Sequence, residues 1–318
     1  MLAGTAIFLF ARTSVVKEVS VGVATGRFVR ISGVDYGQAS VFSVPSVDLV
    51  ALRKRYQLAT SPGAEKVRVL IVPGHEPGFG GAEYKDLKER EMNIELANKL
   101  QALFQADTHY EVSVARSGSD WLPSLKEFFV TKWDDIVVFQ TAKRKEMKSL
   151  LVAGSATKVS SAPHSNALAA VATRLYGINK WANDHKIDIA IHVHFNEYPR
   201  TNATKPGIYN GFAIYVPEAQ FSNAPAAKEV AQRVFRRLSS VARQSNYPYE
   251  ADGVVEDQAL IAVGANNSVD AASMLIEYGY IYEPQFATEA KRQPVFTDYA
   301  ATTYAGVKDF FEGVSVVQ

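Results

Sequence analysis

Short, almost continuous apolar runs recur along the chain, separated by segments with helical spacing. They include VRVLIV (67–72), DIAIHVHF (188–195) and MLIEYGYI (274–281). Runs of this length with few polar residues are typical of strands buried on both faces, as in a parallel sheet. The sequence therefore predicts an α/β sandwich in which helices cover a mainly parallel sheet.

The remaining predicted elements follow the same alternation of strand and helix. Further strands are predicted at 110–116, 135–140 and 211–216. Helices are predicted at about 48–58, 90–105, 165–184, 224–244 and 297–312, where apolar residues recur at helical spacing. This order favours one α/β domain rather than separate helical and β domains.

The beginning of the chain differs in pattern from the rest. Residues 13–46 alternate apolar and polar positions, so residues 1–65 are predicted to form a small β-rich segment. The turn-rich SPGAE (61–65) precedes the main domain, predicted at 66–318. The apolar run 1–11 is shorter than the ~20 residues that span a bilayer and lacks a basic n-region. It is either the stub of a membrane anchor or a buried strand.

Charge and cysteine content narrow the possible partners. The chain has 34 Lys and Arg residues and 33 Asp and Glu residues, which gives a net charge of +1. No overall electrostatic field therefore favours binding to nucleic acid or to an anionic membrane. The chain has no cysteine, which excludes disulfides and thiolate metal sites. A metal would therefore need His and carboxylate ligands.

Polar residues at the carboxyl ends of predicted strands are the first candidates for a site, because ligands bind at that edge of open α/β sheets. His75 follows the strand at 67–72, and His194 ends the strand at 188–195. Glu89 begins the next helix. Two His and one Glu form a recognised three-ligand set for catalytic zinc. The alternatives are hydrogen-bonded structural histidines and a glutamate that interacts with the helix dipole.

Glu277 is the fourth candidate, and it lies inside the apolar run at 274–281. An ionised carboxylate is costly there unless it is paired or coordinated, which favours a functional role as much as a structural one. Beside a metal it would act as a general base.

Four ordered motifs resemble the zinc-dependent N-acetylmuramoyl-L-alanine amidase family, over about residues 66–315. VRVLIVPGHEPGFGG, with Glu89 and then Asn93 four residues later, resembles the family's first strand, Pro-Gly-His turn and helix start. YEVSVARSGSD, IDIAIHVHFN and SMLIEYGYI resemble its later strands. The resemblance implies a three-layer sandwich around a mixed, mostly parallel sheet.

The resemblance also implies roles for these residues. His75, Glu89 and His194 would hold Zn²⁺, and Glu277 would be the catalytic residue that moves the proton from water to the leaving amine. The residues expected on the substrate side are Asn196, Glu197 and Arg116, with Tyr198 and Arg200 nearby. The implied reaction is hydrolysis of the amide between N-acetylmuramic acid and L-alanine, in peptidoglycan or muropeptides. The implied location is the cell envelope outside the cytoplasmic membrane, with a possible N-terminal tether.

Three positions depart from the family pattern: Val72 replaces Asp, Glu76 replaces Gly, and His192 replaces Ser. Because Val72 cannot accept a hydrogen bond from a metal-bound imidazole, that acceptor must come from elsewhere. His192 points to the same face as His194, so it is either a rival ligand or a hydrogen-bonded core residue. Glu91 is a rival to Glu89.

Residues 118–164 lengthen the chain relative to the family and are predicted to be an insertion. Within it, Trp121, Phe128, Phe129 and Trp133 recur at roughly helical spacing. They predict either a helix stripe that faces the core or a lid over the groove.

Two other functions are consistent with the same fold. One is a zinc peptidase or amidase that acts on a different amide, because the pocket rather than the metal sets specificity. The other is a non-catalytic cell-wall binding protein. A binding protein has no need of Glu277 in an apolar strand, which argues against this last alternative.

Overall fold

The computed structural model describes residues 41–42, 44–164, 167–198, 200, 202 and 204–313, all within one compact unit, Tyr36–Gln318. The possible anchor stub at 1–11 and most of the β-rich segment expected at 13–46 lie outside the described residues. Within the described ranges, no helix is long and apolar enough to cross a membrane.

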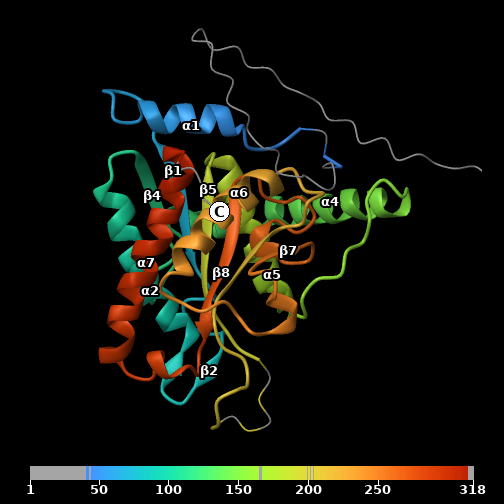
Figure 1. The fold of residues 1–318 in the computed structure, drawn as a ribbon. Helices are drawn as coiled ribbons and strands as arrows, with labels where there is room; N and C mark the ends of the chain where they lie inside the picture. Colours follow the sequence, from blue (N-terminus) through green and yellow to red (C-terminus); the bar gives the residue numbers. More distant parts are fainter. Residues whose placement is uncertain are drawn as a thin grey trace, which may run out of the picture. The chain divides into compact units, whose positions relative to one another are not determined.

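The described residues form a six-stranded sheet with the order β4-β1-β5-β8-β6-β7 (Figure 1). Its strands are β1 (Val67–Pro73), β4 (Tyr110–Val114), β5 (Ile189–Asn196), β6 (Ala213–Pro217), β7 (Val254–Asp257) and β8 (Ala272–Tyr280). β4, β1, β5 and β8 are parallel, β6 is antiparallel to β8, and β7 is parallel to β6. The predicted mixed, mostly parallel sheet is confirmed.

Helices cover both faces of this sheet. They are α1 (Leu49–Leu58), α2 (Glu89–Ala106), α3 (Pro123–Thr131), α4 (Trp133–Val152), α5 (Ala169–Asp184), α6 (Ala224–Leu238) and α7 (Glu289–Glu312). Alternate residues of β5 divide between two cores: Ile191 packs with α2, α6 and α7, whereas Ala190 packs with α3 and α5. Figure 1 shows α2 and α7 on one side of the sheet and α5 on the other, which confirms the predicted sandwich.

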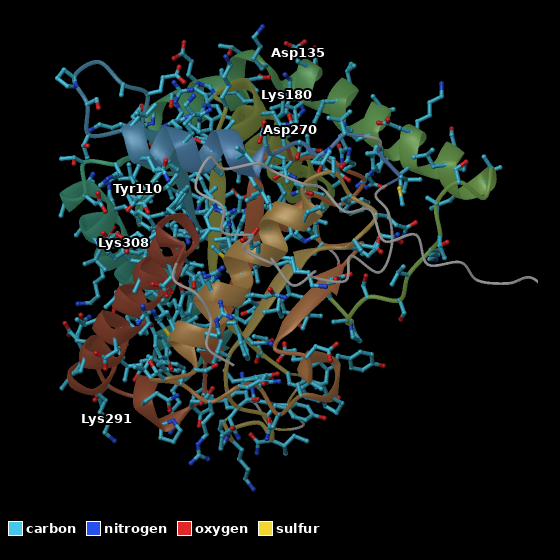
Figure 2. The ribbon with its side chains drawn as sticks, turned by 45° about the horizontal axis from the view of Figure 1, so that its top comes forward. Tyr110, Asp135, Lys180, Asp270, Lys291 and Lys308 are labelled. Carbon is cyan, nitrogen blue, oxygen red and sulfur yellow. The ribbon has the colours of Figure 1, made fainter. Side chains whose placement is uncertain are left out.

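Aromatic side chains join the edge strand to the helices on its face. Tyr110 of β4, labelled in Figure 2, contacts the rings of Phe104 on α2 and Phe311 on α7, with ring centroids 4.9 and 6.0 Å apart. Phe104 is fully buried, so these contacts belong to the main core.

The prediction of a strand at 135–140 is wrong, because these residues lie in α4 (Asp135 is labelled in Figure 2). Ile136 and Gln140, four residues apart, are buried, whereas Val138 is 68% exposed. That is the burial pattern of a helix, which a short apolar run cannot reveal by itself. β7 was not predicted, because its residues VVED are half polar and lack the apolar run of the central strands.

The predicted insertion contains α3 and α4. Phe129 is buried in the core beneath α5, and Trp121 and Phe128 pack against the same cluster. Gly177 of α5 lies so close that an added Cβ would be 2.9 Å from the Phe129 ring. The burial of these aromatics favours the core-facing interpretation of the stripe.

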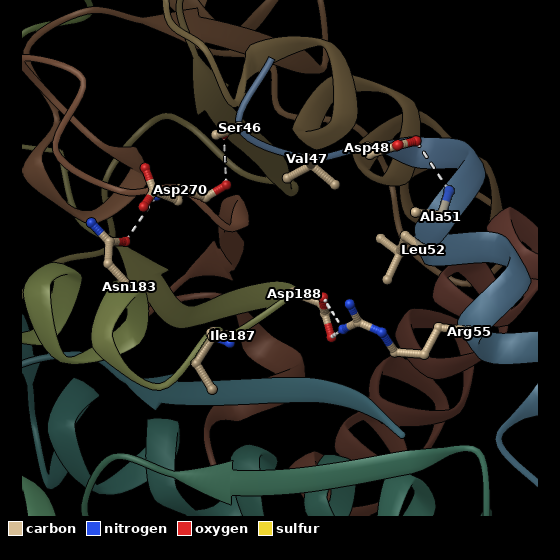
Figure 3. Close-up of a pocket in the computed structure, with 11 residues that line it drawn as sticks. Ser46, Val47, Asp48, Ala51, Leu52, Arg55, Asn183, Ile187, Asp188 and Asp270 are labelled. Atoms are coloured by element: carbon tan, nitrogen blue, oxygen red, sulfur yellow. Dashed lines mark hydrogen bonds and ion pairs between the residues drawn. The ribbon is translucent and has the colours of Figure 1, made fainter. Parts of the chain in front are cut away.

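α1 lies at the amino edge of the sheet. Its Arg55 binds both carboxylate oxygens of Asp188, just before β5, at 2.7 and 2.8 Å. A cavity of about 350 Å³ lies beside this ion pair, and Figure 3 shows Asp48 and Asp270 on its walls. This cavity is at the edge opposite to the carboxyl ends of the parallel strands, where the candidate site residues lie.

The crossing of α6 and α7 depends on Gly306. A Cβ at this position would be 2.4 Å from the Cα of Val234, so the two helix backbones would have to separate. We expect Gly306→Ala to lower the free energy of unfolding by about 1–2 kcal/mol, after the ~1 kcal/mol that alanine gains in helix propensity. Gly118→Ala is the control, because nothing lies within 4 Å of its added Cβ. Equal denaturation midpoints for the two variants would contradict this packing.

Candidate metal centre and active site

The carboxyl ends of β1, β5 and β8 bring the candidate residues together. His75 lies in the turn after β1, and the Gly74 N–H donates to the carbonyl oxygen of Val193 in β5 at 2.9 Å. His194 of β5 is paired in register with Glu277 of β8, so their side chains share one face of the sheet. His75 has a φ of 69°, a left-handed conformation that is costly for a residue with a Cβ and is concentrated at functional sites.

The three predicted metal ligands meet at this edge. His75 Nε2 is 2.8 Å from Glu89 Oε2, and His194 Nδ1 is 3.0 Å from Glu89 Oε1. One ligand atom from each residue lies within 4.8 Å of the other two. The described residues thus place two imidazole nitrogens and one carboxylate oxygen around one point.

The carboxylate of Glu89 is fixed by backbone donors as well as by the histidines. Glu89 is the first residue of α2 and is 4% exposed. Its carboxylate accepts hydrogen bonds from the backbone N–H groups of Ala82 (2.8 Å) and Phe195 (3.2 Å). Burial alone would raise the pKa of Glu89, but His75 and His194 lower it well below its usual value. Burial lowers the pKa of His194, which favours the neutral imidazole that binds metals.

Two observations test whether these residues fit a zinc ion. His75 Nε2 is buried and has no hydrogen-bond partner, because its 2.8 Å contact with Glu89 lacks hydrogen-bond direction. A glycine backbone lies against each histidine ring, where a side chain would not fit. An added Cβ at Gly81 would be 2.8 Å from His75 Cδ2, and one at Gly74 would be 2.2 Å from His194 Cε1. Two His and one Glu are the protein ligands of known catalytic zinc sites. The residues therefore fit Zn²⁺.

The close approach at Gly74 gives a test of this arrangement. In Gly74→Ala the new methyl group displaces the His194 ring, so we expect zinc affinity to fall by at least the roughly 10–100-fold seen for changes around metal ligands. Gly78→Ala in the same loop is the control, since nothing lies within 4 Å of its Cβ. The measurement is zinc titration against a competing chelator. Equal affinities for both variants would rule out this position of His194.

Arg116 lies beneath the His75 turn. It is 2% exposed, and its guanidinium donates to the carbonyl oxygens of Pro73 (3.0 Å), Arg90 (3.0 Å) and Gly74. The place of Arg116 on the substrate side stays a prediction; in the described structure its guanidinium binds main-chain carbonyl groups of the His75 turn and of α2. Asn93, which is fully buried, also donates to the Gly74 carbonyl, at 3.3 Å.

One of the three departures from the family pattern, Glu76, has a structural partner in α5. Glu76 accepts a hydrogen bond from Arg174 of α5 at 2.7 Å, which ties the His75 turn to that helix. His192 is 2% exposed and lies outside the group of His75, Glu89 and His194, and burial lowers its pKa to about 3. Glu91 is exposed and pairs with Lys88 at 3.1 Å. Neither rival residue joins the metal-ligand group in the described structure.

Glu277 carries a carboxylate oxygen, Oε2, that is buried and has no hydrogen-bond partner. Burial raises the pKa of Glu277 well above its usual value, and the negative charges of Glu89 and Glu250 raise it further. A carboxyl group in this environment takes up a proton readily, as a proton-transfer residue must.

Glu250, in the short 3₁₀ helix η1 (Pro248–Glu250), is a buried residue of the site that the sequence did not reveal. Its carboxylate accepts hydrogen bonds from Asn196 Nδ2 (2.7 Å), the Tyr215 hydroxyl (2.7 Å) and the Tyr280 hydroxyl (3.1 Å). The surrounding sequence, YPYEADG, is turn-rich and gives no sign of burial. Asn196, expected on the substrate side, is thus held by Glu250.

Glu197 and Arg200 follow Asn196. Glu197 is exposed and accepts a hydrogen bond from Arg200 Nε at 3.0 Å. Arg200 also lies over the rings of Tyr84 and Tyr282, 5.0 and 5.7 Å from their centroids.

Comparison with known proteins identifies the family. The family model described as N-acetylmuramoyl-L-alanine amidase matches residues 69–309, which include every residue of the candidate site. The chain belongs to this family. No curated protein sequence matches the chain significantly.

Solved structures of three amidases are similar to this chain. Ami1, the N-acetylmuramyl-L-alanine amidase from Mycobacterium smegmatis, has a TM-score of 0.50 at 13% identity, covering 78% of this chain and 100% of that one. An amidase from Clostridium difficile 630 has a TM-score of 0.49 at 18% identity, covering 79% and 100%. AmiC2 of Nostoc punctiforme has a TM-score of 0.49 at 13% identity, covering 79% and 99%. The likeness to the Mycobacterium smegmatis structure supports the fold.

Proposed function

We propose that this chain is a zinc-dependent amidase that hydrolyses the bond between the lactyl carboxyl group of N-acetylmuramic acid and L-alanine in peptidoglycan. The observation that carries the proposal is the group of His75, Glu89 and His194 beside the buried, unpaired carboxylate oxygen of Glu277, in a chain of this family. Such a substrate places the protein in the cell envelope, outside the cytoplasmic membrane.

Three residues of the site would bind the metal, and a fourth would transfer protons. His75, Glu89 and His194 would hold Zn²⁺, which when bound polarises a carbonyl group and makes water a better nucleophile. Glu277 takes a proton from the water that attacks the carbonyl carbon. It then gives a proton to the nitrogen as the C–N bond breaks, so that it ends as it began. The products are a free lactyl carboxylate and a peptide with an amino-terminal L-alanine.

The wall of the site beyond Glu277 is polar and held in place. Asn196 donates a hydrogen bond through Nδ2 to Glu250. The side-chain carbonyl oxygen of Asn196 would then accept a hydrogen bond from a substrate N–H. Glu197, the next residue, is exposed and would lie on the substrate side of the same strand end. These two residues would orient the amide before attack.

The products of peptidoglycan digestion test which bond is cut. The zinc-loaded protein is incubated with purified peptidoglycan, and the soluble products are identified by mass. We expect intact stem peptides that begin with L-alanine, and glycan from which peptide has been removed. Cleavage within the peptide would replace this proposal by a peptidase. Binding to the wall without any release would replace it by a binding protein.

A further inference from the structure

Four tyrosine rings lie together near the candidate site. The ring centroids of Tyr198 and Tyr209 are 4.6 Å apart, those of Tyr209 and Tyr247 are 4.8 Å apart, and those of Tyr247 and Tyr249 are 5.4 Å apart. Tyr198 and Tyr247 are also in contact, at 5.3 Å. We call these four residues the tyrosine platform.

The topology places the tyrosine platform at the same edge of the sheet as Glu277. Tyr198 follows β5 at its carboxyl end. Tyr209 precedes β6, which runs antiparallel to β8 and begins opposite Glu277. Tyr247 and Tyr249 lie at η1, just before β7, which is parallel to β6. Segments far apart in the sequence therefore converge on this edge.

The tyrosine platform is linked to the candidate active site by direct contacts. Glu250 follows Tyr249 and accepts the hydrogen bond from Asn196, two residues after His194. Tyr280 donates to Glu250 at 3.1 Å, and its ring is 6.3 Å from that of Tyr209. The buried carboxylate thus fixes both the amide of Asn196 and the base of the tyrosine platform.

The platform presents aromatic surface to solvent. Tyr249 is 55% exposed, and the other three tyrosines are partly exposed, whereas Tyr280 beneath them is fully buried. Tyrosine has an apolar ring face and a polar hydroxyl, so it binds partners that are apolar on one face and polar at the rim. Because it has few rotatable bonds, it loses little entropy on binding.

The rings of an N-acetylated sugar have this combination: C–H groups on the pyranose face, and hydroxyl and acetamido groups at the rim. The net charge of the chain is only +1, so no overall positive field favours a phosphate polymer that would otherwise stack on tyrosines. We propose that the tyrosine platform binds the glycan strand, holding sugar rings next to the one whose peptide is removed. This inference rests on the proposed function.

Binding of an N-acetylglucosamine oligomer to the metal-free protein tests this proposal without hydrolysis. Calorimetry on a β-1,4-linked hexamer should detect binding by the wild type. At ~0.5–1.5 kcal/mol per aromatic contact, we expect Tyr249→Ala and Tyr247→Ala each to weaken it by roughly 2- to 12-fold. Tyr249→Phe keeps the ring and should retain most of the affinity.

The control is Leu58→Ala on α1, at the opposite edge of the sheet, where Leu58 is 49% exposed, similar to Tyr249. It should bind the hexamer as the wild type does. Absence of binding by the wild type, or equal affinity in the wild type, Tyr249→Ala and Tyr247→Ala, overturns the glycan subsite. Because the protein carries no metal in this experiment, its result is separate from the test of amide hydrolysis.

Discussion

Glu277→Gln is expected to lower the rate of amide hydrolysis by roughly 10²–10⁴-fold, the usual contribution of general acid–base catalysis. Glutamine has nearly the same shape as glutamate, but its amide cannot accept and return the proton. Zinc content should stay at the wild-type value, because Glu277 is outside the group formed by His75, Glu89 and His194. The measurement is kcat on peptidoglycan together with bound zinc.

Two further results make this prediction specific. The unfolding free energy should not fall, since the substitution removes a buried carboxyl that has an unpaired oxygen and lies near the charges of Glu89 and Glu250. Glu91→Gln is the control: Glu91 is exposed and pairs with Lys88, so the rate should be unchanged. Wild-type kcat in Glu277→Gln would remove Glu277 from the reaction.

His194→Ala is expected to abolish both tight zinc binding and hydrolysis. The loss of affinity should exceed the roughly 10–100-fold that changes in the partners of metal ligands cause, because a ligand itself is lost. Zinc at 100 times its Kd should stabilise the wild type by about 2.7 kcal/mol, and this stabilisation should be absent in the variant. Thermal unfolding with and without zinc measures the difference.

The matched control for this substitution is His185→Ala. His185 lies after α5 at the amino edge and stacks on Trp181, with ring centroids 3.9 Å apart, so its loss changes packing but not the candidate zinc site. Zinc should still raise the melting temperature of this variant. If zinc stabilised both variants equally, His194 would not be a ligand.

The sheet was predictable because its central strands are apolar on both faces. β1, β5 and β8 appear as continuous runs, and their parallel arrangement brings His75, His194 and Glu277 to one edge. α4 could not be recognised in this way, because DIVVFQ is as apolar as a strand and its burial at Ile136 and Gln140 depends on packing against the rest of the fold.

Residues that act through tertiary contacts were the hardest to predict. Arg116 matches a family position, but nothing in the sequence shows that its guanidinium satisfies the carbonyl groups of Pro73 and Gly74. Glu250 has no motif at all. Its burial depends on contacts with the ends of β5 and β8, where Asn196 and Tyr280 supply its hydrogen bonds.

The most direct test of the account is addition of zinc to chelator-treated protein in the presence of purified peptidoglycan, with the new amino-terminal L-alanine counted as zinc is added. We expect no release without zinc, release that rises to a plateau at one zinc per chain, and no release from His194→Ala. Full release from the metal-free protein, or release from His194→Ala equal to that of the wild type, would contradict a zinc amidase built on His75, Glu89 and His194.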